Sequence, residues 1–308
     1  MLLQQLTSFL DGGCAVNKEE HTMEELIINY TPTGMVPMKS DNPNVPLSVH
    51  EIIEDVHQAY EIGITLVHLH ARHPQTFEPD FRLEVYGPIL EGVRQHCPDL
   101  VCGVSLSGRN FNEFKMRSEP LQLLPDMASL TLSSLNFSRQ ASVNAPDMVQ
   151  ELLHAIYAHG AQPELEVFDL GMMNYAQYLI RKGWLKKPLY FNLLFGNIAS
   201  MQPRFSHLGA VVQELPDDAW YAFAGIGDSQ LPVHLMALAS GAGIRVGLED
   251  NLYFDSRRNQ LASNHDLLRR VHHLANVVER PVMSSITFGQ AGFYNTHRIK
   301  KHRHEHAN

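Results

Sequence analysis

The feature that most constrains the fold is a regular alternation of short β-rich runs with longer amphipathic segments along most of the chain. The amphipathic segments, such as VHEIIEDVHQAYEIG, place apolar residues at three- and four-residue intervals, which is the helical period. The eight runs predicted as strands span residues 26–31, 65–70, 101–107, 127–133, 165–170, 189–195, 220–226 and 243–249. Eight strands with helices between them over 308 residues predict a (β/α)8 TIM barrel. A doubly wound sheet has the same alternation and is the alternative.

Single residues mark where several predicted helices begin and end. Gly63, Gly160 and Gly183 each stand between a helical pattern and the next strand, as C-terminal cap glycines do. The last helical pattern opens with Ser263 in the sequence Ser-Asn-His-Asp, which is typical of an N-cap. No Gly/Ser-rich linker divides the chain. We therefore predict an N-terminal extension over residues 1–22, one barrel domain over residues 23–296 and a basic, histidine-rich tail over residues 297–308.

The composition argues against several classes of function. Hydrophobic residues make up 44% of the chain and charged residues 19%, which is an ordinary globular balance. A net charge of −9 argues against a nucleic-acid or anionic-membrane surface. No apolar run approaches the roughly 20 residues that span a bilayer, and the N-terminus does not resemble a signal peptide. The three cysteines form no CxxC pair, which favours a reducing compartment, so we expect a cytoplasmic protein.

Two histidines interrupt the apolar run LVHLHAR, which is predicted as the second strand. Residues two apart on a strand share a face and lie about 6.6 Å apart. His68, His70 and Arg72 are therefore predicted to face the barrel interior, while Val67 and Leu69 face the helices. A hydrogen-bonded core histidine is the alternative at each position. A His-x-His pair at a strand end also suits a divalent metal ion.

The last predicted strand supplies a carboxylate at the matching end of the barrel. In the sequence RVGLED, Arg245 and Glu249 share one face, and Asp250 follows. The first and eighth strands of a closed barrel are neighbours, and barrel active sites lie at the C-terminal ends of the strands. Glu249 is thus predicted to reach an ion held by His68 and His70, in a catalytic His2Glu site with open positions. The alternative for Arg245 is an internal salt bridge that closes the barrel.

Further polar residues at predicted strand ends are candidates for lining the same pocket. For most of them taken alone, a hydrogen-bonding or capping role is the simpler interpretation. Glu166 differs, because a carboxylate inside a barrel is costly unless it is paired. The candidates are Asn29, Tyr30 and Thr31 on the first strand, Ser105 and Ser107 on the third, Ser129, Thr131 and Ser133 on the fourth, Glu166 on the fifth and Asn192 on the sixth.

Five segments together form a specific pattern. They are TPTG at 31–34, VHLHAR at 67–72, PDMASLTLSSLNF at 125–137, PELEVFDLGM at 163–172 and RVGLEDN at 245–251. This pattern resembles the β-keto acid cleavage enzyme family, and the resemblance extends from about Leu26 to about Pro281. Members of that family are (β/α)8-barrel enzymes that use a divalent ion, usually zinc. They react a β-keto acid with acetyl-CoA to give acetoacetate and a new acyl-CoA.

The resemblance implies a role for each matching residue. It implies that His68, His70 and Glu249 are the metal ligands and that Arg245 with Asp250 is the proton-transfer pair. In GVSLSGR, Ser105 and Gly108 stand where the family's STGG serine and final glycine bind substrate, and the serine is also placed to orient the base. Ser129 takes the place of a substrate-binding threonine, and Glu166 matches the second acid of PExEV. The resemblance further implies a homo-oligomer, in particular a tetramer.

This chain departs from the family pattern at the end of the first strand. The family's type enzyme acts on 3-keto-5-aminohexanoate and has an acid two residues after the Thr-Gly, where it pairs with the substrate amine. Here that position is Val36, in TPTGMVP. An apolar side chain cannot pair with an ammonium group, so Val36 argues against the amino substrate. Glu166 remains as a contact for a polar or cationic group of the substrate.

Two other classes of function fit the same residues. A metal-dependent aldolase or hydrolase would use the same barrel and ion but would not need acetyl-CoA. A non-catalytic metal- or ligand-binding barrel would need no proton-transfer pair, so the presence of Arg245 and Asp250 argues against it. The identity of the keto acid is not determined by the sequence.

Overall fold

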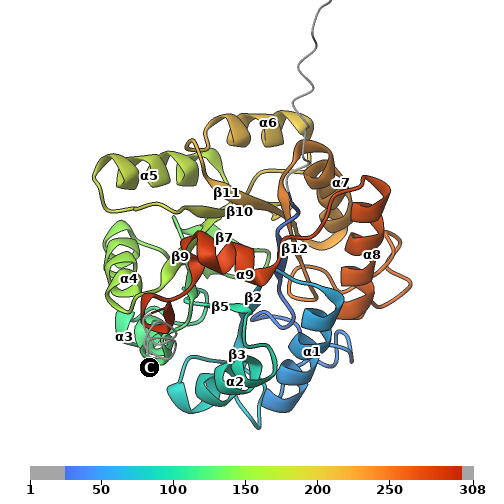
Figure 1. Cartoon of the computed structure of the whole chain (residues 1–308), viewed down its shortest axis with the longest axis horizontal. Coiled ribbons are helices and arrows are strands. Elements are labelled where there is room, and N and C mark those ends of the chain that lie inside the picture. The colour runs from blue at the N-terminus through green and yellow to red at the C-terminus, as the bar shows by residue number, and fades with distance from the viewer. Residues whose placement is uncertain (1–24, 300–308) are drawn as a thin grey trace, which may run out of the picture.

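In a computed structural model, residues 25–299 are described, and they form a closed barrel of eight parallel strands surrounded by helices (Figure 1). Around the barrel the strands are β1 (Ile28–Tyr30), β12 (Gly243–Val246), β11 (Trp220–Gly225), β10 (Tyr190–Phe195), β9 (Gln162–Val167), β6 (Met127–Thr131), β5 (Val101–Val104) and β2 (Leu66–Leu69). The barrel closes because β1 pairs with both β2 and β12, with Asn29 opposite Leu66 and Arg245. This closure confirms the predicted (β/α)8 barrel and excludes the doubly wound sheet.

Helices connect successive strands, and the predicted caps are confirmed. Gly63, Gly160 and Gly183 all have positive φ, where a residue without Cβ is favoured. Ser263 is an N-cap whose side chain accepts a hydrogen bond from the backbone of Asp266. The α-helices are α1 (Val49–Ile62), α2 (Leu83–His96), α3 (Phe114–Ser118), α4 (Pro146–Ala158), α5 (Leu170–Arg181), α6 (Phe205–Gln213), α7 (Gln230–Ser240), α8 (Asn264–Val277) and α9 (Ser285–Phe288). Further helical segments are the 3₁₀-helices η1 (Glu119–Leu123) and η2 (Gly227–Ser229) and the π-helix η3 (Gly289–Phe293).

The core has an outer layer between barrel and helices and an inner layer at the N-terminal ends of the strands. Val67 and Leu69 belong to the outer layer, as the alternation predicted. The inner layer contains Leu66, Met127 and Tyr190 packed against Phe288 at the end of α9. Figure 1 shows α9 lying across the centre of the barrel on the viewer's side. The N-terminal end of the barrel is therefore filled with apolar side chains, and the polar site lies at the opposite end.

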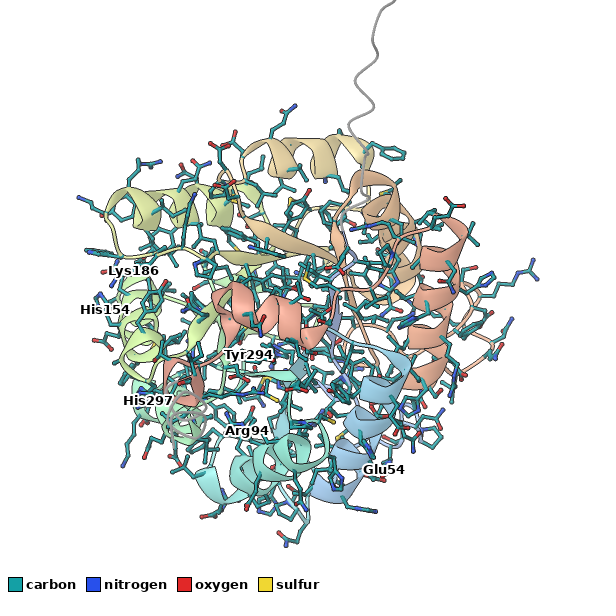
Figure 2. The ribbon with its side chains drawn as sticks, in the orientation of Figure 1. Glu54, Arg94, His154, Lys186, Tyr294 and His297 are labelled. Carbon is teal, nitrogen blue, oxygen red and sulfur yellow. The ribbon has the colours of Figure 1, made fainter. Side chains whose placement is uncertain are left out.

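Hydrogen bonds hold the C-terminal segment against the N-terminal end of the barrel. Tyr294, labelled in Figure 2, donates its hydroxyl to the carbonyl of Asp99 at 2.7 Å. The backbone of Asn295 donates to Asp126 at 2.9 Å. The predicted extension over residues 1–22 and most of the predicted tail over residues 297–308 lie outside the described residues. Within the described chain, none of the helices combines the length and apolarity that a bilayer crossing requires.

Two short hairpins follow barrel strands at the C-terminal end. They are β3 (Ala71–Arg72) with β4 (Pro79–Asp80) and β7 (Leu135–Asn136) with β8 (Ala141–Ser142). The prediction that Arg72 faces the barrel interior is wrong, because the barrel strand ends at Leu69 and Arg72 belongs to β3. Its guanidinium donates instead to the carbonyls of Gly34 and Pro37, each at 2.9 Å. Arg72 thereby holds the loop after β1 that carries Val36.

Several barrel strands differ in length from their predicted bounds. The strand predicted over 243–249 ends at Val246, so Glu249 and Asp250 lie in the turn that follows β12. The backbone of Glu249 donates to the carbonyl of Thr31 at 3.2 Å, which ties this turn to the end of β1. The strand predicted over 165–170 begins earlier, at Gln162, and this earlier start brings Glu164 into the barrel.

Candidate active site

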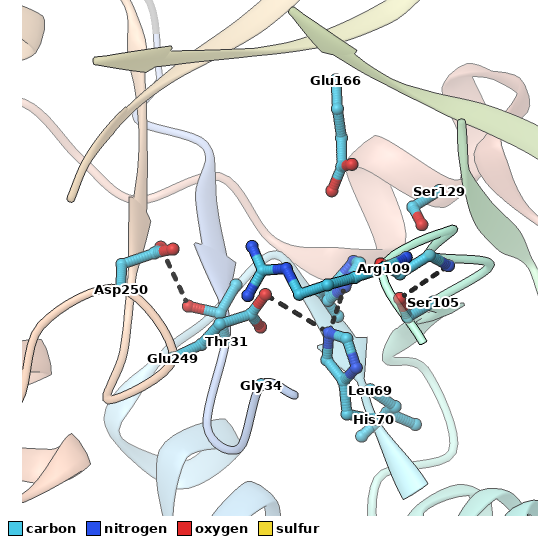
Figure 3. A network of polar contacts seen from close by, with 12 residues as sticks. Thr31, Gly34, Leu69, His70, Ser105, Arg109, Ser129, Glu166, Glu249 and Asp250 are labelled. Atoms are coloured by element: carbon cyan, nitrogen blue, oxygen red, sulfur yellow. Dashed lines mark hydrogen bonds and ion pairs between the residues drawn. The ribbon is translucent and has the colours of Figure 1, made fainter. Parts of the chain in front are cut away.

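The three predicted metal ligands converge at the C-terminal end of the barrel, where Figure 3 shows a dashed contact between Glu249 and His70. The Nε2 atoms of His68 and His70 lie 3.1 Å apart, and Nε2 of His70 lies 3.3 Å from Oε1 of Glu249. One donor atom from each of the three residues lies within 4.8 Å of the others. Donors bound tetrahedrally at zinc distances are about 3.3 Å from one another. Oε2 of Glu249 is also buried and has no hydrogen-bond partner in residues 25–299. The observed donor set therefore fits a divalent ion.

A fully buried carboxylate orients the first of these histidines. Oε2 of Glu164 lies 2.8 Å from Nδ1 of His68. Because an ionised carboxylate only accepts, Nδ1 carries the proton and Nε2 is left to face the other ligands. Burial lowers the pKa of His68, but without a metal ion the carboxylates of Glu164 and Glu249 outweigh it and raise the pKa to about 9, so an ion that binds Nε2 displaces the proton there. Burial alone would raise the pKa of Glu164, but His68 and Arg245 lower it to about 2.

Amide side chains from two other strands complete the surroundings of Glu164. Asn29 of β1 donates to its Oε1 at 2.6 Å, and Asn192 of β10 donates to the same oxygen. Both amides are fully buried, as is Glu164. The hydrogen-bonding interpretation of Asn29 and Asn192 thus agrees with the structure. The carboxylate that they hold is the one that fixes His68.

Arg245 lies beside the ligands and pairs with two acids of the turn after β12. Its Nε donates to Oδ2 of Asp250 at 3.0 Å, and its Nη2 donates to Oε1 of Glu249 at 2.7 Å. Burial lowers the pKa of Arg245, but Asp250 and Glu249 raise it well above its ordinary value, so the guanidinium stays charged. Burial raises the pKa of Asp250 above its ordinary value, although Arg245 opposes this shift. Asp250 is therefore a stronger proton acceptor than an exposed aspartate.

These groups open into a cavity of about 600 Å³. Ser105, Glu166 and Val36 line it together with His70 and Asp250. Val36 is 48% exposed and presents an apolar side chain to the cavity wall. The cavity thus brings His70, Glu249, the Arg–Asp pair and part of the predicted substrate contacts into one space, while His68 is buried beside His70 and is not part of its lining.

Two of the predicted substrate contacts, Ser129 and Gly108, are not among the residues that line the cavity. Ser129 accepts a hydrogen bond from the backbone of Leu106 at 3.0 Å. Gly108 is buried, and a Cβ added there would lie 2.5 Å from the carbonyl of Val143. Both residues support the loop that follows β5. Thr131 lies two residues after Ser129 on β6. It lines the cavity, and its hydroxyl donates to Glu166 at 2.6 Å.

Comparison with known proteins identifies the family. A sequence model described as beta-keto acid cleavage enzyme matches residues 25–288. The chain belongs to this family. A 3-keto-5-aminohexanoate cleavage enzyme from Acetoanaerobium sticklandii is 31% identical over 84% of this chain and 95% of its own length. A 3-oxoadipate:acetyl-CoA acetyltransferase from Cupriavidus necator is 36% identical over 83% of this chain and 90% of its own length.

Solved structures share the fold of this member of the beta-keto acid cleavage enzyme family. A binary complex of ObcA with oxaloacetate superposes with a TM-score of 0.73 at 20% identity. The match covers 82% of this chain and 66% of the ObcA chain. At this identity the likeness concerns the barrel architecture alone.

Sequence reasoning missed Glu164, although the signal was present. In PELEV, Glu164 and Glu166 are two residues apart and therefore share a face of one strand. The predicted strand began at residue 165, one residue too late to include Glu164. Sequence reasoning also did not indicate Arg109, which lines the cavity from the loop after β5, where no strand period indicates the direction of a side chain.

We expect Glu164→Gln to weaken metal binding, because the amide no longer attracts the Nδ1 proton of His68 with a full charge. Removing a group that hydrogen-bonds a metal-binding histidine lowers metal affinity by about 10- to 100-fold. Competition with a chelator measures the affinity. Glu151→Gln, which changes an exposed acid of α4, is the control and should leave the affinity unchanged. Equal affinities of wild type and Glu164→Gln would contradict the orienting role.

We expect Gly34→Ala to displace Glu249 and to lower metal affinity. Gly34 has φ +64°, and a Cβ added there would lie 2.6 Å from Cγ of Glu249. Gly183 offers a matched control, because it has φ +70° and no atom within 4 Å of an added Cβ. Both alanines carry the cost of a positive φ, about 1 kcal/mol, but only Gly34→Ala meets a predicted ligand. Thermal unfolding and metal titration of both variants separate the two effects. Unchanged metal affinity in Gly34→Ala would contradict the placement of Glu249.

Proposed function

We propose that this protein is a divalent-metal-dependent enzyme that converts a β-keto acid and acetyl-CoA to acetoacetate and a new acyl-CoA. The observation that carries the proposal is the convergence of His68, His70 and Glu249 with the Arg245–Asp250 pair in one cavity of a family member. The relatives' names describe reactions of keto acids with acetyl-CoA, as for the acetyltransferase acting on 3-oxoadipate. Zinc is the proposed ion, since two imidazoles and one carboxylate are zinc ligands in catalytic sites.

His68, His70 and Glu249 would hold the ion. The ion would supply positive charge to offset the negative charge that develops on the keto acid. Glu164 keeps His68 in the tautomer that ligation needs. Glu249 contributes the anionic ligand, and Arg245 holds its Oε1 at 2.7 Å. The positions of the ligands are thus fixed by buried partners before any substrate enters.

Asp250 is the proposed base, with Arg245 as its charge partner. The carbon between the ketone and the carboxylate of the substrate is acidic, and Asp250 removes its proton. The resulting carbanion attacks the acetyl carbonyl of acetyl-CoA, a C–C bond forms, and the thioester C–S bond breaks to release CoA thiolate. The thiolate then attacks the original ketone carbon. The adjacent C–C bond breaks, the new acyl-CoA leaves, and the proton on Asp250 returns to acetoacetate.

The remaining cavity residues are proposed to bind the substrates. Ser105 is placed to orient Asp250 or the substrate carboxylate, and Glu166 and Val36 contact the part of the keto acid beyond the ketone. Ser129 and Gly108 act through the loop that carries Ser105. We further propose that the protein is cytoplasmic, as the cysteine pattern favours, and that it assembles as a homotetramer, as the family resemblance implies.

The test is a panel of cationic, neutral and anionic β-keto acids, each incubated with the purified protein with and without acetyl-CoA. We expect acetoacetate only where acetyl-CoA is present. Turnover of a keto acid without acetyl-CoA would support an aldolase or hydrolase instead. Metal binding without turnover of any member of the panel would support a non-catalytic binding barrel.

A further inference from the structure

Arg109 enters the cavity from the loop after β5 and has no role in the reaction described so far. Its side chain extends across the site in Figure 3, above His70 and toward Glu249 and Asp250, and no dashed contact is drawn to its guanidinium. Its Nε is buried and has no hydrogen-bond partner in the described part of the chain. A buried donor without a partner is costly, so this arrangement indicates a group that binds a ligand.

The guanidinium is held rigidly by an aromatic ring. Its Cζ lies 3.6 Å from the ring centroid of Phe137, which follows β7. The ring of Phe137 in turn packs edge-on against Phe168 at 5.7 Å. A guanidinium stacked in this way keeps its in-plane N–H donors available for a carboxylate. Little side-chain freedom is lost when a ligand binds, which favours affinity.

The acids near Arg109 already have other partners. Burial lowers the pKa of Arg109, and the charges of Glu249, Glu166 and Asp250 oppose this shift. Yet Glu249 and Asp250 pair directly with Arg245. Glu166 accepts from a threonine hydroxyl at 2.6 Å and lies 3.8 Å from Arg245. The charge of Arg109 is therefore available to an anion that enters the cavity.

Three other arginines line the cavity, namely Arg139, Arg245 and Arg258, and Arg139 is exposed. Arg258 pairs with Asp228 at 2.8 Å. Arg117 donates to the carbonyl of Leu106 at 2.8 Å and to the side chain of Asn144 at the same distance. Arg109 is half-buried in the cavity wall, and its buried Nε has no acceptor among residues 25–299.

We propose that Arg109 binds a second carboxylate of the substrate, so that the preferred substrates are β-keto dicarboxylic acids. The inference rests on the proposed function and deepens it by naming the substrate class. Val36 supports it from another part of the wall, because its apolar side chain offers nothing to a cationic substituent. A carboxylate and a guanidinium form paired, charge-assisted hydrogen bonds that a neutral substituent cannot make.

Arg109 could also bind the C1 carboxylate that every β-keto acid carries. Two acids with the same number of carbons distinguish binding of the C1 carboxylate from binding of a second carboxylate. 3-Oxoadipate has a carboxylate at the end where 3-oxohexanoate has a methyl group. If Arg109 bound the shared C1 carboxylate, its removal would affect both acids equally.

The experiment measures kcat/KM for both acids with acetyl-CoA in the wild type and in Arg109→Gln. We expect the wild type to favour 3-oxoadipate by at least about 10-fold, as a charge-assisted pair implies. Arg109→Gln should lower kcat/KM for 3-oxoadipate by about 10- to 100-fold, mainly through KM, and change that for 3-oxohexanoate by less than about 3-fold. Arg181→Gln, which removes an exposed charge on α5, is the control for net charge and should match the wild type.

Two outcomes of the kinetic experiment would overturn the inference. If Arg109→Gln lowers kcat/KM equally for both acids, Arg109 binds the shared C1 carboxylate or the CoA substrate. If the wild type has the higher kcat/KM for 3-oxohexanoate, a second carboxylate is not what the site prefers. Calorimetric binding of each acid without acetyl-CoA keeps this test separate from the test of the reaction. If no acid yields acetoacetate but 3-oxoadipate binds the wild type and not Arg109→Gln, the proposed reaction fails and the dicarboxylate site stands. If both acids bind the two proteins equally, the site fails as well.

Discussion

Glu249→Gln is expected to lose the metal ion and, with it, turnover. The amide keeps the shape of the side chain but removes the only anionic ligand that lies within 4.8 Å of both histidine donors in the described chain. It also removes the negative charge beside Nη2 of Arg245, which contacts Oε1 of Glu249 at 2.7 Å, and leaves a neutral amide acceptor there. Because the ion is proposed to stabilise the enolate, we expect kcat to fall by roughly 10³-fold or more. Metal content by mass spectrometry and acetoacetate formation measure the two effects.

The sequence of the tail contains several histidines that offer further imidazole ligands, so the comparison must hold the tail constant. Wild type, Glu249→Gln and the control Glu91→Gln all carry the same residues 297–308. Glu91 is an exposed acid of α2, so its variant should keep both the metal and the activity of the wild type. A Glu249→Gln protein with full metal content and normal turnover would contradict the ligand assignment.

Asp250→Asn is expected to keep the metal and to stop the reaction. The asparagine has nearly the shape of the aspartate and can still accept a hydrogen bond from Arg245, but it cannot take a proton. Loss of a general base costs about 10²- to 10⁴-fold in rate. Exchange of the C2 proton of a keto acid for deuterium, followed by nuclear magnetic resonance without acetyl-CoA, isolates the step assigned to Asp250. That exchange should occur in the wild type and disappear in the variant.

Glu249→Gln is expected to lose the metal ion and Asp250→Asn to keep it, so metal content separates loss of a ligand from loss of the base. If Asp250→Asn lost the ion together with activity, Asp250 would be a structural partner of the ligands through Arg245. If Asp250→Asn kept both the ion and the exchange reaction, another group would be the base. Each outcome is distinct from the one expected for Glu249→Gln.

The sequence predicted the barrel and the convergence of His68, His70 and Glu249 because these depend on simple periodicities. Strand alternation places both histidines on the inner face, and closure of the barrel brings the β12 end beside them. The exact path of the chain at Glu249 was not predictable. Glu249 reaches the site from a turn because Gly34 and Gly247 allow the loops after β1 and β12 to approach closely, and a Cβ at Gly247 would lie 2.0 Å from the carbonyl of Thr31.

What the sequence did not predict depends on strand boundaries and loop directions. Glu164 was missed because β9 begins at Gln162, earlier than the apolar run suggested. Ser129 and Gly108 matched a family motif, yet neither lines the cavity, because Ser129 accepts from the backbone of Leu106 and Gly108 packs against the carbonyl of Val143. Arg109 is directed into the cavity by its contact with Phe137. No pattern in the sequence connects these two loops.

The central claim is that the acetyl group of acetyl-CoA becomes part of acetoacetate while the acyl part of the keto acid leaves as its CoA thioester. Acetyl-CoA labelled with ¹³C at the acetyl carbonyl tests this directly. The account predicts that the label appears at the ketone carbon of acetoacetate and that the new acyl-CoA is unlabelled. Unlabelled acetoacetate, or products that form at the same rate without acetyl-CoA, would contradict it.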